Sequence, residues 1–292
     1  MNEPAPTLLR ARAEDLAGRL PPLLAEADRL ATAVMLGEHG RRRSGMGDEF
    51  WQYRPAHPGD DARAIDWRRS ARSDAHYVRE KEWQAAQSVA LWVDDARSMG
   101  FSGDARRPSK AQRAQVLALA AGLLLLRAGE RVGLADGRLA VRAGQAQAAR
   151  LAAALIEEGG QDYGAPATAG PVPQGRALFL SDFFGDPARV ETALGRAAEQ
   201  GVRGVLLMVL DPAEESFPYD GRTIFESMGG GLRHETQRAG DLRARYAARL
   251  AERKDRLTAL ARATGWQFAC HHTDTPAAPA LLWLYRSLER RR

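Results

Sequence analysis

The stretch SVALWVDDARSM, residues 88–99, decides the fold class of this chain, because an apolar run leads directly into two aspartates. An almost unbroken apolar run of this length is typical of a strand that is buried on both faces of a parallel sheet. Two later segments, RALFLSD and GVLLMVLDP, have the same form and also end in an acid. We therefore predict three buried strands that end in Asp94, Asp182 and Asp211.

Helical segments alternate with these strands. Apolar spacing predicts helices over 110–128, over AQAARLAAALIEEG, and over 187–200, 240–263 and 276–290. RVGLAD and RLAVRAG are expected to form a hairpin around Asp136-Gly137, and RTIFES and WQFACHH further short strands. The alternation predicts an α/β fold, in which helices flank a mostly parallel, Rossmann-like sheet.

The N-terminal part of the chain has a different pattern. Residues 7–36 have helical spacing with a break at Pro21-Pro22, and residues 50–83 alternate aromatic and charged residues around a turn at Pro58-Gly59. This pattern predicts a helix followed by short strands or ribbons. We accordingly divide the chain into an N-terminal helix and β extension, residues 1–86, and an α/β domain, residues 87–292.

Composition narrows the functional classes. The formal net charge is +5 and the pI about 9.7, but only three of the 42 basic residues are lysines. The arginines are spread along the chain among acids, which argues against a nucleic-acid surface. The one cysteine, Cys270, and the absence of a signal-peptide pattern fit the cytoplasm. The most apolar run, residues 116–126, is shorter than the roughly 20 residues of a membrane span, so no membrane insertion is expected.

The acids at the strand ends raise the question of a metal. Ligands of open α/β sheets gather beyond the carboxyl ends of the strands, where Asp94, Asp182 and Asp211 are expected to converge. The loop after the first strand also resembles the D-x-S-x-S motif of von Willebrand factor A domains, whose adhesion site holds a metal ion. Asp94 and Ser98 match that motif, Ala96 stands where it has a serine, and Asp182 fits its later aspartate.

Two interpretations of this depleted site stay open. One is a weak Mg²⁺ site at Asp94, Ser98 and Asp182, with Thr168 as a poorly placed fourth ligand and Asp95 as a substitute if its side chain turns inward. The other is an empty loop whose acids pair with arginines. Mg²⁺ is the one cofactor that the residues indicate.

The segment from Gly37 to Met99 resembles the signature of domain-of-unknown-function family 58, proteins in which this signature precedes a von Willebrand A-like strand. The ordered run is G-x-G-x-E-F, then R, GD-x-x-R-x-I-D-W, A-R and V-R-E-x-E. In this sequence the run comprises Gly45, Gly47, Glu49, Phe50, Arg54, Gly59, Asp60, Arg63, Ile65, Asp66, Trp67, Ala71, Arg72, Val78, Arg79, Glu80 and Glu82.

The resemblance implies a partner rather than a reaction. Members of the family are associated with MoxR-type AAA+ ATPases and are thought to act in chaperone-like assembly on client proteins. Arginines and aromatic residues are common anchors of protein interfaces. The residues predicted to bind the partner are Arg54, Asp60, Arg63, Asp66, Trp67 and Arg72. A purely structural network is the alternative, with Arg-carboxylate pairs over Trp51, Tyr53 and Trp67.

The expected function is that of a non-enzymatic protein-interaction module with a degenerate metal-ion site. The alternative is a metal-dependent hydrolase or nuclease that uses Asp94 and Asp182. Cys270, His272 and Asp274 form a further cluster near the C-terminus, but two or three ligands are a weak metal signal. The sequence contains no nucleophile elbow, no phosphate-binding lysine loop and no dinucleotide fingerprint.

Overall fold

The computed structural model describes residues 22–35, 50–57, 65–71, 76–81, 86–157, 159–167 and 172–289. The chain divides into two units, one made of residues 38–86 and the other of residues 1–37 together with 87–292. The helix 22–35 therefore belongs with the sheet, whereas the sequence assigned it to the extension. The reason is its apolar side: Ala27, Ala31 and Val34 are buried in the core of the larger unit.

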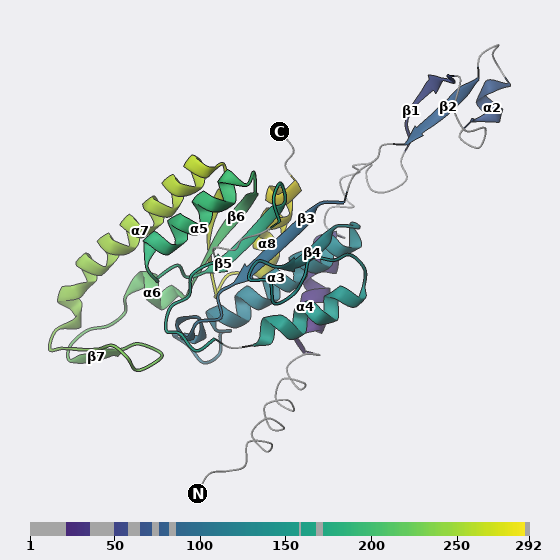
Figure 1. Cartoon of the computed structure of the whole chain (residues 1–292). Helices are drawn as coiled ribbons and strands as arrows, with labels where there is room; N and C mark the ends of the chain where they lie inside the picture. Colours follow the sequence, from purple (N-terminus) through teal and green to yellow (C-terminus); the bar gives the residue numbers. More distant parts are fainter. Residues whose placement is uncertain are drawn as a thin grey trace, which may run out of the picture. The chain divides into compact units, whose positions relative to one another are not determined.

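The larger unit is built on five parallel strands in the order β4-β3-β5-β6-β9 (Figure 1). The strands are β3 (Ser88–Val93), β4 (Arg131–Leu134), β5 (Arg176–Ser181), β6 (Arg203–Leu210) and β9 (Gln267–His272). Counted along the chain, this is the doubly wound order 2-1-3-4-5, whose switch point lies between β3 and β5. The predicted α/β class with a parallel sheet is confirmed, and the strands ending in Asp94 and Asp182 are neighbours.

Helices cover both faces of the sheet, as Figure 1 shows for α3 and α4 on one side and α5 and α7 on the other. Alternate strand residues point to opposite faces, so Leu91 packs with α3, α4, α8 and the helix 22–35, while Trp92 packs with α5 and α7. The helices are α3 (Lys110–Arg127), α4 (Ala146–Ile156), α5 (Pro187–Glu199), α7 (Arg243–Thr264) and α8 (Ala277–Glu289).

Helix α3, predicted over 110–128, is apolar on nearly all sides and is buried over most of its length. Its start is set by a capping box, in which the Ser109 side chain accepts from the Gln112 amide while the Gln112 side chain accepts from the amide of Ser109. Its first residue, Lys110, is a lysine with no exposed surface. The cap therefore places a buried cation at the carboxyl edge of the sheet, with an aliphatic helix behind it.

Three smaller elements differ from the prediction. The expected hairpin at Asp136-Gly137 contains one antiparallel bridge, Val132 to Arg142, and RLAVRAG is not a strand. The predicted strand RTIFES is β7 (Thr223–Glu226), and it pairs with β8 (Arg233–Thr236), a polar segment that the sequence did not reveal. The short helix α6 (Pro212–Ser216) follows β6 and was also missed. Short 3-10 helices, η2 (Arg97–Gly100) and η3 (Ala239–Leu242), complete the larger unit.

The smaller unit contains an antiparallel pair, β1 (Phe50–Pro55) and β2 (Tyr77–Lys81), and one helical turn, α2 (Trp67–Ser70). The predicted ribbon is thus present, while its turn at Pro58-Gly59 lies outside the described residues. Trp67 is 58% exposed, and its ring lies in a T-shaped contact with that of His76, with 5.5 Å between the ring centroids. Most residues of the alternative charged network lie outside the described residues. Within the described ranges of both units, no helix combines the length and the apolar character needed to cross a bilayer.

Candidate functional site

Three aspartates follow three parallel strands and lie at one edge of the sheet. Asp94 follows β3, Asp182 follows β5 and Asp211 follows β6. All three are buried, with exposed fractions of 2%, 1% and 0%. Since buried carboxylates need partners, the hydrogen bonds of each acid indicate what this edge can do. We call Asp94, Asp182, Asp211 and the side chains bound to them the strand-end site.

Asp94 is held by the strand beside it. Its Oδ2 accepts from the Ser181 hydroxyl at 2.6 Å, and its Oδ1 accepts from the Ala96 amide at 2.9 Å. Ser181 Oγ in turn accepts from the amide of Phe183, which has a left-handed backbone with φ of 52°. Burial, with a smaller contribution from nearby Asp182, raises the pKa of Asp94 to about 6. Asp94 thus joins the ends of β3 and β5 and changes charge near neutral pH.

We predict that Asp94→Asn changes the pH dependence of stability. Because the pKa of Asp94 is about 6 when folded and 3.8 ordinarily, the folded state binds the proton more tightly. Proton binding by Asp94 therefore contributes fully to stability below about pH 4, and this contribution is lost as the pH rises through 6. Relative to wild type, the variant should gain about 3 kcal/mol between pH 4 and pH 7. Urea unfolding at each pH measures this difference, and a constant difference across the range would contradict the assignment.

Asp182 is paired with a lysine rather than an arginine. Lys110 Nζ donates to Asp182 Oδ2 at 2.7 Å and to Glu214 Oε1 at 2.6 Å. Burial disfavours the charged ammonium, but the two carboxylates outweigh it and raise the pKa of Lys110 above its ordinary value. The rings of Phe101 and Phe184 lie 5.8 and 5.0 Å from Nζ. The ammonium is therefore charged at neutral pH and enclosed by carboxylates and aromatic faces.

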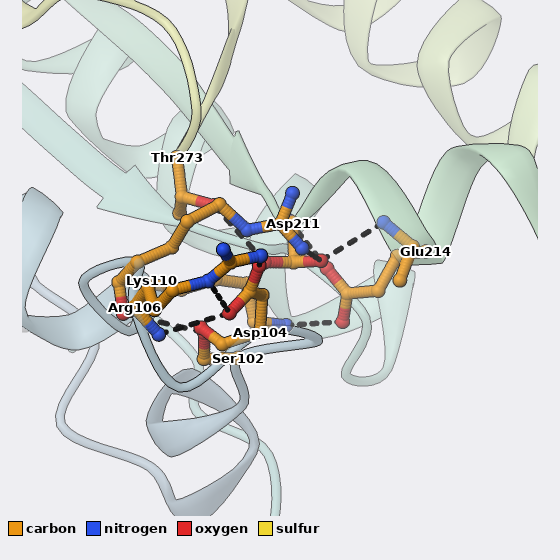
Figure 2. Close-up of polar contacts among 9 residues, drawn as sticks. Ser102, Asp104, Arg106, Lys110, Asp211, Glu214 and Thr273 are labelled. Carbon is orange, nitrogen blue, oxygen red and sulfur yellow. Dashed lines mark hydrogen bonds and ion pairs between the residues drawn. The ribbon is translucent and has the colours of Figure 1, made fainter.

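Asp211 completes the strand-end site at β6 and β9. Its Oδ2 accepts from the Thr273 hydroxyl at 3.0 Å, and its Oδ1 accepts from the Ala213 amide at 2.9 Å and from Arg107 at 3.3 Å. Figure 2 shows Lys110, Asp211, Glu214 and Thr273 gathered beside the loop that carries Ser102, Asp104 and Arg106. Loops that follow four different strands thus meet in one hydrogen-bonded cluster.

The loop 159–167 lies against the end of β3. A Cβ atom on Gly164 would come within 2.6 Å of Asp94 Cγ, and one on Gly159 within 2.6 Å of Asp95 Oδ1. The Gly159 amide also donates to the Asp95 carbonyl at 2.9 Å. Only glycine leaves room for this close approach. The loop therefore covers Asp94 and adds to its burial.

The predicted metal ligands do not fit a divalent cation in this arrangement. Both oxygens of Asp94 are engaged, and Asp182 accepts from Lys110 with Oδ2 and from the Phe184 amide with Oδ1. Asp95 faces Arg138 at 3.4 Å instead of turning inward. The buried hydroxyl of Ser98 has no hydrogen-bond partner, and Thr168 lies outside the described residues. In the part of the chain that the structure describes, no three histidine, cysteine or acidic side chains cluster to hold a metal.

Cys270 and His272 of the C-terminal cluster lie near the same two charged groups, Glu215 and Lys254. The Nε2 atom of His272 contacts Glu215, which also pairs with Lys254. Burial raises the pKa of the Cys270 thiol to about 11, so it is protonated at neutral pH. Cys270 and His271 also line a cavity of about 250 Å³ beside α8, together with Pro276, Pro279, Ala280 and Trp283 among others. Among the described residues, the thiol belongs to no group of side chains that could hold a metal.

The predicted partner-binding residues belong to the smaller unit, and the structure describes three of them. Trp67 is exposed, and the Asp66 carbonyl accepts from the amide and the hydroxyl of Ser70. The backbone of Arg54 pairs in β1. The other three lie outside the described residues: Asp60, Arg63 and Arg72.

The sequence did not reveal Lys110, the basic residue of the strand-end site, or Glu214, the second carboxylate that Lys110 binds. Lys110 and Glu214 are 104 residues apart, and no local pattern joins them. One signal was available for Lys110: a cation in the first turn of a helix opposes the helix dipole. A lysine at that position in a chain with 39 arginines among its 42 basic residues suggests a specific partner.

The strand order and the strand-end acids define a doubly wound α/β protein with a polar cluster at its switch point. Residues 52–256 match the family model described as protein of unknown function DUF58. The match covers more than half of the chain, and the chain belongs to this family. A comparison with curated proteins found none that matches the sequence.

Two solved structures are similar to this chain. One is a conserved hypothetical protein BatB from Bacteroides thetaiotaomicron, with 17% identity and a TM-score of 0.39. The other is an aerotolerance-related membrane protein from Bacteroides fragilis NCTC 9343 with multiple mutations to serines, with 16% identity and a TM-score of 0.40. Each match covers 68% of this chain and 97% of the other.

Proposed function

We propose that this protein is a non-enzymatic protein-interaction module with a degenerate metal-ion site. In this proposal it works in the cytoplasm with a MoxR-type AAA+ ATPase, in the chaperone-like assembly or maturation of client protein complexes. The ATPase is suggested by the family signature at residues 37–99, and the degenerate site by the von Willebrand A-like loop at residues 94–98.

One observation carries the non-enzymatic part of the proposal. The acids at the carboxyl edge, where an α/β enzyme of this topology would act, are bound to other groups of the same chain. A general base or a nucleophile must be within reach of a substrate. Here Asp94, Asp182 and Asp211 are at most 2% exposed. The arrangement favours a structural role for these acids and a binding role for the surface of the module.

The signature segment supplies the surface for a partner. Trp67 presents a large aromatic side chain that is 58% exposed, next to Asp66 and the arginines of the signature. Exposed tryptophan beside arginine is the composition of binding hot spots. We propose that the ATPase contacts this segment through Arg54, Asp60, Arg63, Asp66, Trp67 and Arg72.

We predict that Trp67→Ala weakens binding of the MoxR-type ATPase from the same organism by at least about 30-fold, the loss typical of a hot-spot residue. Biolayer interferometry with the full chain and the purified ATPase, in the presence of ATP, measures this change. Leu232→Ala is the matched control, because it removes another apolar side chain, 63% exposed, from the β7–β8 hairpin of the larger unit.

Four outcomes would contradict parts of the proposal. Wild-type affinity in Trp67→Ala would remove the signature segment as the binding surface, and a loss confined to Leu232→Ala would move that surface to the hairpin. No binding of wild-type protein to the ATPase would overturn the partnership. Mg²⁺- or Mn²⁺-dependent cleavage of phosphoesters or nucleic acids that disappears in Asp94→Ala would establish the hydrolase alternative.

A further inference from the structure

Lys110 occupies a position that is unusual for a lysine. It is the first residue of α3, has no exposed surface, and directs Nζ between the loops that follow β5 and β6. A buried ammonium is costly unless charged partners surround it. Asp182 and Glu214 provide that compensation at 2.7 and 2.6 Å. The lysine therefore stabilises the two carboxylates. It does not stabilise the helix, because a cation in the first turn opposes the helix dipole.

The two carboxylates are bound in matching ways. Asp182 directs Oδ2 at Lys110 and accepts from the Phe184 amide with Oδ1 at 2.9 Å. Glu214 directs Oε1 at Lys110 and accepts from the Asp211 amide with Oε2 at 2.9 Å. Each acid thus has one oxygen fixed by the backbone and one turned toward the same point. Two carboxylate oxygens that converge on one cation resemble part of the coordination shell of a hard metal ion.

We propose that Lys110 is the built-in cation of the strand-end site and takes the place of a divalent metal between Asp182 and Glu214. A metal ion bound by these oxygens would need contacts of about 2.0–2.6 Å and would lie against the ammonium. Since like charges at that separation repel strongly in a buried site, the metal and the lysine exclude one another. The site therefore forms without metal and stays closed to it.

The inference deepens the proposal of a degenerate metal-ion site at one of its residues, Asp182, by naming the cation that this acid binds instead of a metal. It does not depend on the ATPase, because its test measures metal binding by the isolated chain. If Lys110 is the substitute cation, Lys110→Ala leaves two converging carboxylate oxygens with no cation between them. The variant should then acquire a site for Mn²⁺ or Mg²⁺ that the wild type lacks.

The experiment compares wild type, Lys110→Ala and Lys254→Ala by Mn²⁺ titration calorimetry and by thermal unfolding with and without Mn²⁺. Lys254→Ala is the matched control, because Lys254 also pairs with an acid of α6, Glu215, but at the surface. We expect Mn²⁺ at roughly 100 times its Kd to raise the Tm of Lys110→Ala by about 5 °C or more. Wild type and Lys254→Ala should show no such shift.

Two results would overturn the inference. The first is stoichiometric Mn²⁺ binding by the wild type that disappears in Asp182→Asn, since the lysine would then not exclude the metal. The second is a folded Lys110→Ala protein whose Tm and titration heats do not respond to Mn²⁺. If Lys110→Ala does not fold, Lys110→Ser replaces it, and if neither folds, the wild-type titration alone decides. Failure of this inference leaves ATPase binding by the signature segment untouched, because that is measured separately.

Discussion

Lys110→Met should lower the free energy of unfolding by about 3–5 kcal/mol at pH 7 in metal-free buffer, the loss typical when one partner of a buried ion pair is removed. Methionine keeps the length and the apolar stem of the side chain but removes the ammonium. Asp182 and Glu214 then lie in a buried site without a cation between them. Urea unfolding of the full chain measures the loss.

The pH dependence of this loss identifies its electrostatic origin. Burial already raises the pKa of Glu214 against the opposing effect of Lys110, so removal of the lysine raises it further. The variant's folded state then binds a proton more tightly than its unfolded state, and its deficit relative to wild type should shrink as the pH falls below that raised pKa.

Two controls accompany this prediction. Lys254→Met should cost less than about 1 kcal/mol, because it breaks an ion pair at the surface. Adding Asp182→Asn and Glu214→Gln to Lys110→Met should recover part of the loss, since the uncompensated charges are removed. A loss from Lys110→Met that is below 1 kcal/mol, or that does not change with pH, would show that the ammonium is not essential to the cluster.

Phe179→Ala should lower the free energy of unfolding by about 3–5 kcal/mol, as expected for the truncation of a buried phenylalanine. Phe179 lies in β5, the central strand of the sheet, and is 1% exposed. Its ring centroid is 5.6 Å from that of Trp92 and 5.0 Å from that of Trp266. Truncation leaves a cavity between Trp92 of β3 and Trp266, which directly precedes β9. Rigid indole rings on both sides cannot collapse to fill it.

Phe179→Leu and Ile224→Ala test this explanation. Leucine fills part of the cavity, so its cost should be well below that of alanine. Ile224 lies on the exposed β7–β8 hairpin and is 45% exposed, so its truncation should change stability by no more than about 0.5 kcal/mol. Thermal or urea unfolding of the three variants measures the series. Equal losses for alanine and leucine at position 179 would contradict a cavity as the cause.

The sheet was predictable from sequence because its strands are buried on both faces. SVALWV, RALFLS and GVLLMVL are continuous apolar segments, and each was placed correctly as a strand. The β8 strand, RHET, has no apolar alternation, since its residues are mostly exposed and its position depends on pairing with β7. Helix α6 has five residues, which is too short for a helical period to emerge.

The strand-end site was predictable in its acids but not in its cation. Asp94, Asp182 and Asp211 each follow an apolar strand directly, so strand direction alone places them at one edge. Their partners come from other parts of the chain: Ser181 from β5, Lys110 from the start of α3 and Thr273 from the end of β9. Pairings with arginines were expected, and Arg107 and Arg138 do pair with acids, but the central position belongs to a lysine.

The amino-acid sequence by itself determined the main strands and helices of the sheet domain, the edge at which the aspartates gather and the family signature, because each depends on neighbouring residues or on the period of burial. Only the tertiary structure decided which cation neutralises Asp182. Lys110 and Asp182 are 72 positions apart in the chain and meet only in the folded protein. A contact between such distant residues produces no periodic pattern in the sequence. The packing of α3 against the sheet brings the Lys110 ammonium to the Asp182 carboxylate. Because both groups are removed from water, each needs the other as a charged partner.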